Sequence, residues 1–144
     1  MKSVLAPSLA LVLALSGCSS ESKAAPYLKQ ICVDWKTTNY SGGSIASREN
    51  ITTKVSSQVS SAVALDPEAS AGFQIVVNLM KNVAVLEGQE AEYSGQAFYA
   101  RVVEGNLNQA AYWDAKASER SKEASTEKVN ILKKFSELCE AYQE

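Results

Sequence analysis

The chain has 144 residues, of which 46% are hydrophobic, and a formal net charge of −2. It contains no histidine, which excludes nucleophile systems that use histidine as their base and zinc or haem sites built on imidazole. Basic residues are interspersed with acidic ones and form no patch, so nucleic acid is not an expected partner.

An apolar stretch at residues 4–15 follows Lys2 at the N-terminus. It is too short for a helix that crosses the bilayer core, which needs about 20 residues, and it has the length of the apolar part of a secretory signal. It ends in Leu15-Ser16-Gly17-Cys18. A leucine, two small residues and a cysteine at this position resemble the lipobox of bacterial lipoproteins.

The resemblance implies cleavage of the signal peptide 1–17 between Gly17 and Cys18, and attachment of a diacylglycerol, with an N-acyl group as a second modification, to Cys18. No other cofactor is expected. The protein would then be lipid-anchored outside the cytoplasm. Because Ser19 is not aspartate, the address would be the outer membrane in a Gram-negative cell, and the outer face of the plasma membrane in a Gram-positive one. Plain secretion with an incidental Cys18, or an uncleaved anchor, are the alternatives.

The expected mature chain, 18–144, has a formal charge of −3 because only Lys2 is lost. Residues 18–26 are small and polar, so we expect a flexible tether there. Residues 27–144 are enough for a single domain with one core.

A first short helix is predicted at 26–38, where Leu28, Ile31 and Trp35 recur at helical spacing. The glycine-containing segment 39–43 ends it. A second helix is predicted from Ile45 to Val63. Its many β-branched and serine residues are mediocre helix formers, so a strand over 51–59 is the alternative.

Asp66-Pro67-Glu68 is the clearest helix start, since aspartate caps the open N–H groups and proline fits the first turn. The largely apolar helix that follows is predicted to be the most buried one, over 67–87, and to end at Gly88. A separate alanine-rich helix is expected over 89–104, with Gly105 as its stop.

Asn106 and Gln109 have the spacing of a variant capping box for the last helix, predicted over 107–142. Its middle, 114–128, is nearly all Ala, Ser, Glu, Lys and Arg. This composition indicates either a solvated helix with an alanine seam or a polar kink at 118–125, and we favour the continuous helix. The whole pattern predicts an all-α, up-and-down bundle of four or five helices.

Cys32 and Cys139 lie on apolar faces near the two ends of the domain. In an oxidising compartment such a pair indicates a disulfide that joins the first helix to the last. Two buried free thiols are the alternative.

Candidate chemistry is sparse. Ser125 and Lys128 match Ser-x-x-Lys, but the chain is rich in serine and lacks the companion motifs. Glu87, Glu90 and Glu92 could hold a cation, although a solvated turn around Gly88 is the preferred interpretation. No catalytic residue and no metal ligand is assigned.

Two neighbouring aromatics, Tyr112 and Trp113, are the first candidates for a ligand surface. We expect a membrane-tethered structural or protein-interaction module of the cell envelope. The alternative is a tethered binding module for a small apolar or glycan ligand in a cavity between helices. An enzyme is not expected.

Overall fold

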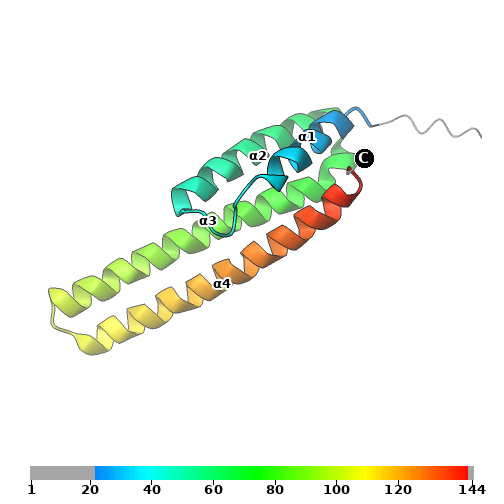
Figure 1. Ribbon diagram of the computed structural model, residues 1–144. Coiled ribbons are helices and arrows are strands. Elements are labelled where there is room, and N and C mark those ends of the chain that lie inside the picture. The colour runs from blue at the N-terminus through cyan, green and yellow to red at the C-terminus, as the bar shows by residue number, and fades with distance from the viewer. Residues whose placement is uncertain (1–21, 143–144) are drawn as a thin grey trace, which may run out of the picture.

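The computed structural model describes residues 22–142, which form four helices and contain no strand. The helices are α1 (Ala25–Lys36), α2 (Ile45–Leu65), α3 (Pro67–Val102) and α4 (Leu107–Glu140). Each runs antiparallel to the one before it, and the helices that adjoin in sequence pack on one another (Figure 1). The all-α, up-and-down bundle predicted from the sequence is confirmed, with four helices.

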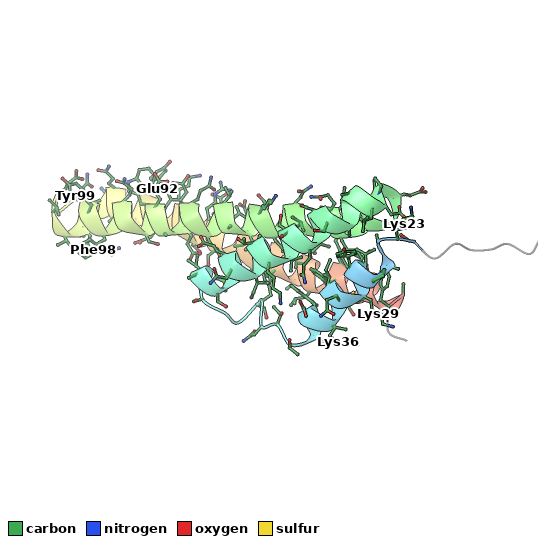
Figure 2. All side chains as sticks on the ribbon, turned by 90° about the horizontal axis from the view of Figure 1, so that it is seen from above. Lys23, Lys29, Lys36, Glu92, Phe98 and Tyr99 are labelled. Carbon is green, nitrogen blue, oxygen red and sulfur yellow. A yellow bond between two sulfur atoms is a disulfide. The ribbon has the colours of Figure 1, made fainter. Side chains whose placement is uncertain are left out.

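The helices differ greatly in length, and this shapes the molecule. α3 and α4 have 36 and 34 residues, whereas α1 and α2 have 12 and 21. At 1.5 Å per residue, α3 is about 54 Å long. α1 and α2 cover only the half of the α3–α4 pair that lies near the chain termini (Figures 1 and 2). We call the covered half the bundle. Residues 88–127 extend beyond it, and we call them the distal hairpin.

Local caps set where three of the helices begin. The side chain of Asp66 accepts a hydrogen bond from the Ala69 amide at 3.0 Å, and Pro67 occupies the first turn of α3. Asn106 accepts one from the Gln109 amide at 3.1 Å and so caps α4. Ser44 caps α2 in the same way. The two starts predicted at Asp66 and Asn106 are confirmed, because capping depends only on residues within one turn.

The prediction that Gly88 ends a helix is wrong. α3 continues through Gly88 to Val102, so the helices expected over 67–87 and 89–104 are one. Glycine inside a helix costs about 1 kcal/mol relative to alanine, and the packing of α3 on α4 offsets this cost. Gly105 is different: its φ of +64° is left-handed, and it separates α3 from α4.

The weakest helix prediction, α2, is confirmed, and the strand alternative over 51–59 is wrong. Val55, Val59 and Ala62 form its buried face. The hydroxyls of Thr52 and Ser60 donate to carbonyls one turn earlier, at 2.8 Å each. The polar side chains are thus accommodated on the helix itself.

The core lies in the bundle and is built from all four helices and the α1–α2 loop. Trp35 of α1 stacks on Phe135 of α4 with ring centroids 3.9 Å apart, and Phe73 of α3 meets the same ring edge-on. Each large apolar side chain buried here contributes about 1.5–3 kcal/mol. The largest fully buried side chains include Leu28, Ile31, Tyr40, Val59, Phe73, Met80, Ile131 and Phe135.

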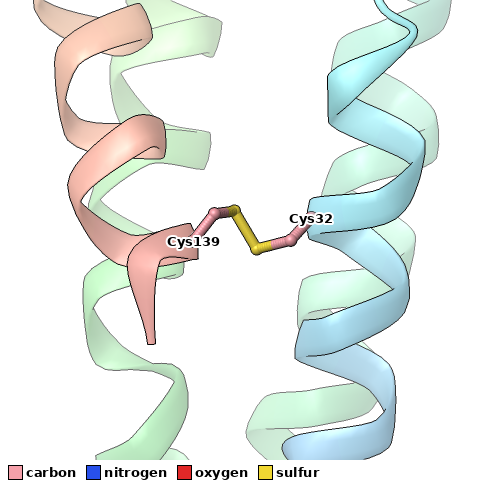
Figure 3. Close-up of a disulfide and its surroundings, with 2 residues drawn as sticks. All are labelled: Cys32 and Cys139. Carbon is pink, nitrogen blue, oxygen red and sulfur yellow. A yellow bond between two sulfur atoms is a disulfide. The ribbon is translucent and has the colours of Figure 1, made fainter. Parts of the chain in front are cut away.

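A disulfide joins Cys32 of α1 to Cys139 of α4 (Figure 3). The two residues are 107 positions apart in the sequence, and their Cα atoms are 5.5 Å apart, within the usual range for a disulfide. α1 packs mainly on α2, so this bond is a strong link between the first helix and the last.

The packed fold begins earlier than the predicted tether 18–26 implies. The Ser22 hydroxyl donates to the Asp66 carboxylate at 2.5 Å, and Ala24 is fully buried. α1 itself begins at Ala25. Cys18 and the expected cleavage site at Gly17 lie outside the described residues.

By length and composition alone, α3 could cross a membrane. Its position explains this composition, because α2 and α4 both pack on it. Phe73, Val76, Met80 and Val83 are each at most 1% exposed. One face of this apolar stretch is the centre of the core, whereas Ile75 and Val85 on its other face are 54% and 57% exposed.

Candidate functional site

Three charged side chains meet where the bundle ends and the distal hairpin begins. Glu87 of α3 accepts hydrogen bonds from both Arg48 of α2 and Lys128 of α4. Arg48 Nε lies 3.1 Å from Glu87 Oε2, and Lys128 Nζ lies 2.7 Å from Glu87 Oε1. Arg48 also donates to the carbonyl of Gly43. We call Arg48, Glu87 and Lys128 the junction triad; it ties three helices together.

Burial makes this triad energetically important. Glu87 is 3% exposed and Arg48 is 8% exposed. Burial by itself would raise the pKa of Glu87, but the hydrogen bonds from Arg48 and Lys128 outweigh it, so the pKa is lowered. Burial raises the pKa of nearby Tyr40 to about 12. Glu87 is therefore a carboxylate at neutral pH, held by two cations.

The prediction that Glu87, Glu90 and Glu92 lie in a solvated turn is wrong. All three lie on α3, and Glu87 points inward to cations that already occupy its carboxylate. Among residues 22–142, no group of three or more potential ligand residues could hold a metal ion. The triad was not predicted from the sequence. A signal for it exists, because each of its three charged residues falls at a core position of its helix. Arg48 continues the series Thr52, Val55, Val59, which is spaced by three and four residues.

The distal hairpin is held by a thin seam of alanines. Ala97 and Ala100 of α3 and Ala110 and Ala124 of α4 are each 1% exposed. Ala110, Ala117, Ala124 and Ile131 recur every seven residues, as in a coiled coil. The predicted alanine seam along a continuous last helix is confirmed, and the kink at 118–125 is absent from α4.

One aromatic pair strengthens this seam. Trp113 stacks on Tyr93 across the hairpin with ring centroids 5.6 Å apart, and Tyr112 meets Trp113 edge-on at 5.0 Å. Tyr112 is 55% exposed, whereas Trp113 is half-buried. The two candidates for a ligand surface therefore lie near the far end of the hairpin, and one of them is partly used in packing.

Exposed apolar side chains gather at the end of the hairpin. Five residues, which we call the apolar tip, are each more than half exposed: Phe98, Tyr99, Val102, Val103 and Leu107. Large exposed apolar groups that cluster in this way mark interaction surfaces. Figure 2 places Phe98 and Tyr99 at the opposite end of the molecule from Lys23, which is close to the first described residue.

The turn within the tip satisfies much of its own backbone. The amides of Val103 and Glu104 donate to the Tyr99 carbonyl at 2.9 and 3.3 Å, and the Asn106 amide donates to the Ala100 carbonyl at 2.9 Å. The Asn106 side chain bonds both the backbone and the side chain of Gln109. The left-handed Gly105 makes this tight closure possible.

An open groove of about 620 Å³ lies between α2 and α3. Its α2 wall consists of hydroxyl side chains and Glu49, and Lys81 and Ala84 form the α3 wall. Tyr112 and Trp113 do not line it. The groove is open, is lined mainly by short hydroxyl-bearing side chains, and lacks the aromatic side chains expected of a ligand site.

No family model matches the chain, and neither curated proteins nor solved structures give a match. The tip and the junction triad are therefore interpreted from their own geometry.

Proposed function

We propose that this protein is a lipid-anchored, extracytoplasmic spacer that presents the apolar tip of a helical hairpin to another component of the cell envelope. The observation that supports this role best is the concentration of exposed apolar side chains at one end of a long, narrow hairpin. A soluble domain gains nothing in stability from such a surface.

The position of the proposed anchor supports the same role. Cys18 precedes Ser22, the first described residue, by four positions. An extended chain spans at most about 3.3–3.6 Å per residue, so a lipid on Cys18 would keep the bundle within roughly 15 Å of the membrane surface. The tip lies at the other end of the molecule (Figure 2).

The base of the spacer is well suited to hold the hairpin in one orientation. The junction triad links α2, α3 and α4, and the disulfide links α1 to α4. A disulfide also agrees with a location outside the cytoplasm, where such bonds persist. The α2–α3 groove is open and has no aromatic lining, which favours the tip over a ligand cavity as the functional surface.

The anchor is tested by metabolic labelling with palmitate. Wild-type protein should carry the label and fractionate with membranes, and Cys18→Ser should lose both properties. Cys32→Ser, which keeps Cys18, is the matched control for loss of a cysteine and should stay labelled. An unlabelled wild-type protein, or membrane-bound Cys18→Ser, would contradict the anchor.

The tip is tested by photo-crosslinking in intact cells. A photoreactive residue is placed at Leu107, which is 69% exposed at the tip, and at Val129, which is 64% exposed on α4 in the bundle. The role predicts adducts with an envelope component from position 107 and none of comparable yield from position 129. Equal yields from both positions would refute it.

A further inference from the structure

We infer that the component engaged by the apolar tip is a lipid surface, into which the tip inserts to interfacial depth. This inference rests on the proposed role of the tip as a docking surface and is independent of whether Cys18 is acylated.

The first argument is the distribution of the apolar side chains around the tip. Phe98 and Tyr99 are neighbours on the outer face of α3, away from the buried Ala97 and Ala100. Val103 lies in the turn, and Leu107 begins α4. All four are more than half exposed. A protein groove covers one face of a helix, whereas a lipid surface surrounds whatever projects into it. The exposed apolar groups cover the outer face of α3, the turn and the start of α4, which is more than one helix face, and are therefore better matched to lipid.

The second argument is charge. Between Tyr93 and Trp113, only Arg101 and Glu104 are charged. Arg101 forms an ion pair with Asp114 at 2.5 Å, directed back along the hairpin. Charged residues become frequent only from Asp114 onward. The tip is thus an almost uncharged cap on a charged hairpin, which favours zwitterionic over anionic lipid.

Aromatic residues with polar groups lie just behind the leading end. Tyr112 and Trp113 follow Leu107 by five and six residues, or about 8–9 Å along α4. Insertion of an amphipathic element typically reaches about 5–10 Å. Tyrosine and tryptophan are enriched at the membrane–water boundary, and this depth would place both rings there.

The third argument is the hydrogen bonding of the turn. Polar backbone groups that enter an apolar phase must be satisfied within the protein. The amides of Val103, Glu104 and Asn106 all donate to carbonyls of α3, and Asn106 caps α4. These three amides therefore keep their hydrogen bonds when the turn leaves water. The carboxylate of Glu104 opposes insertion, so binding is weak and reversible.

The test uses the chain 19–144 without acylation and with its disulfide formed. The four helices, the disulfide and the Ser22–Asp66 hydrogen bond all lie within 22–142, so this chain keeps each of them. Flotation with phosphatidylcholine vesicles measures partitioning. Lipids brominated in the upper acyl chain should quench the fluorescence of Trp113, and Trp113→Phe should abolish this quenching because Trp35 is packed on Phe135 in the bundle.

Matched substitutions separate the tip from general hydrophobicity. Val102→Ser with Leu107→Ser should lower partitioning at least tenfold. Val85→Ser with Val129→Ser, at 57% and 64% exposed sites outside the tip, should leave it unchanged. Glu104→Gln should strengthen it severalfold. Circular dichroism should give the same helix content for all these variants.

Four results would overturn the inference. These are no flotation with excess phosphatidylcholine, equal partitioning of the two double variants, dimerisation that the tip variant abolishes, and in-cell adducts from position 107 that contain protein and no lipid. The last result would leave the proposed spacer role intact. Failure of palmitate labelling would remove the anchor without affecting the vesicle result.

Discussion

Replacing Glu87 by glutamine should destabilise the protein strongly. The amide has nearly the same shape as the carboxylate but no charge, so it leaves Arg48 and Lys128 without their counterion. Removal of one partner from a buried ion pair costs about 3–5 kcal/mol.

The structure favours the lower end of this range. Arg48 is only 9% exposed at its side chain, so it cannot regain water easily, but it keeps its bond to the Gly43 carbonyl. The Lys128 side chain is 18% exposed and flexible enough to turn outward. We therefore expect a loss of about 3 kcal/mol. This is a large part of the roughly 5–15 kcal/mol typical of a domain.

Equilibrium unfolding in urea, with the disulfide intact, measures this loss. A change of about 3 kcal/mol corresponds to a fall in the urea midpoint of about 1–3 M for ordinary m-values. Glu92→Gln is the control, since Glu92 is exposed on the same helix. If Glu87→Gln and Glu92→Gln both cost less than about 1 kcal/mol, the reasoning on the junction triad is wrong.

The stability lost in Glu87→Gln should also depend on pH. The folded-state pKa of Glu87 lies below its usual value of 4.5. Its contribution is therefore fully present above about pH 4.5 and is lost as the pH falls through the lowered pKa. The gap in stability between wild type and Glu87→Gln should be constant at neutral pH and should narrow in acid. If the stability difference between wild type and Glu87→Gln instead widened in acid, the pKa of Glu87 would not be lowered in the folded state.

Three further outcomes follow from the fold. Gly88→Ala and Gly95→Ala should each stabilise the protein by about 0.5–1 kcal/mol, because an added Cβ meets nothing within 4 Å at either position. Gly105→Ala should instead destabilise the protein, since the φ of Gly105 is +64°. The double substitution Cys32→Ser with Cys139→Ser should cost up to about 4–5 kcal/mol in urea unfolding, as expected for a closed loop of 107 residues. Amide hydrogens should exchange faster in the distal hairpin than in the bundle, because an alanine seam buries less apolar area than a core of large side chains.

Each of these outcomes has a contrary result. Loss of stability in Gly88→Ala would mean that the outer face of α3 is not open. A disulfide-free variant as stable as wild type would mean that α1 is held by packing alone. Uniform exchange along α3 would mean that the distal hairpin unfolds only together with the bundle.

Several features of this fold were predictable from short stretches of sequence. Asp66 and Asn106 begin helices, and Gly105 separates two of them, because capping and left-handed backbone depend on residues within one turn. Cys32 and Cys139 were expected to form a disulfide because each lay on an apolar face in a chain with a signal for export. These inferences needed no knowledge of which helices touch.

Other features depended on contacts between distant parts of the chain. Gly88 does not end α3, because packing on α4 continues past it. Glu87 is buried because Arg48 and Lys128 approach it from two other helices. Leu107 is exposed for the opposite reason: α1 and α2 are too short to reach it.

The sequence by itself determined the helical class, the helix starts at Asp66 and Asn106 and the disulfide partners, since these follow from local chemistry and residue type. Only the tertiary structure decided which apolar and charged side chains are buried. Burial depends on neighbours that are remote in sequence. Here α1 and α2 are too short to reach the tip of the hairpin, so its apolar side chains stay exposed.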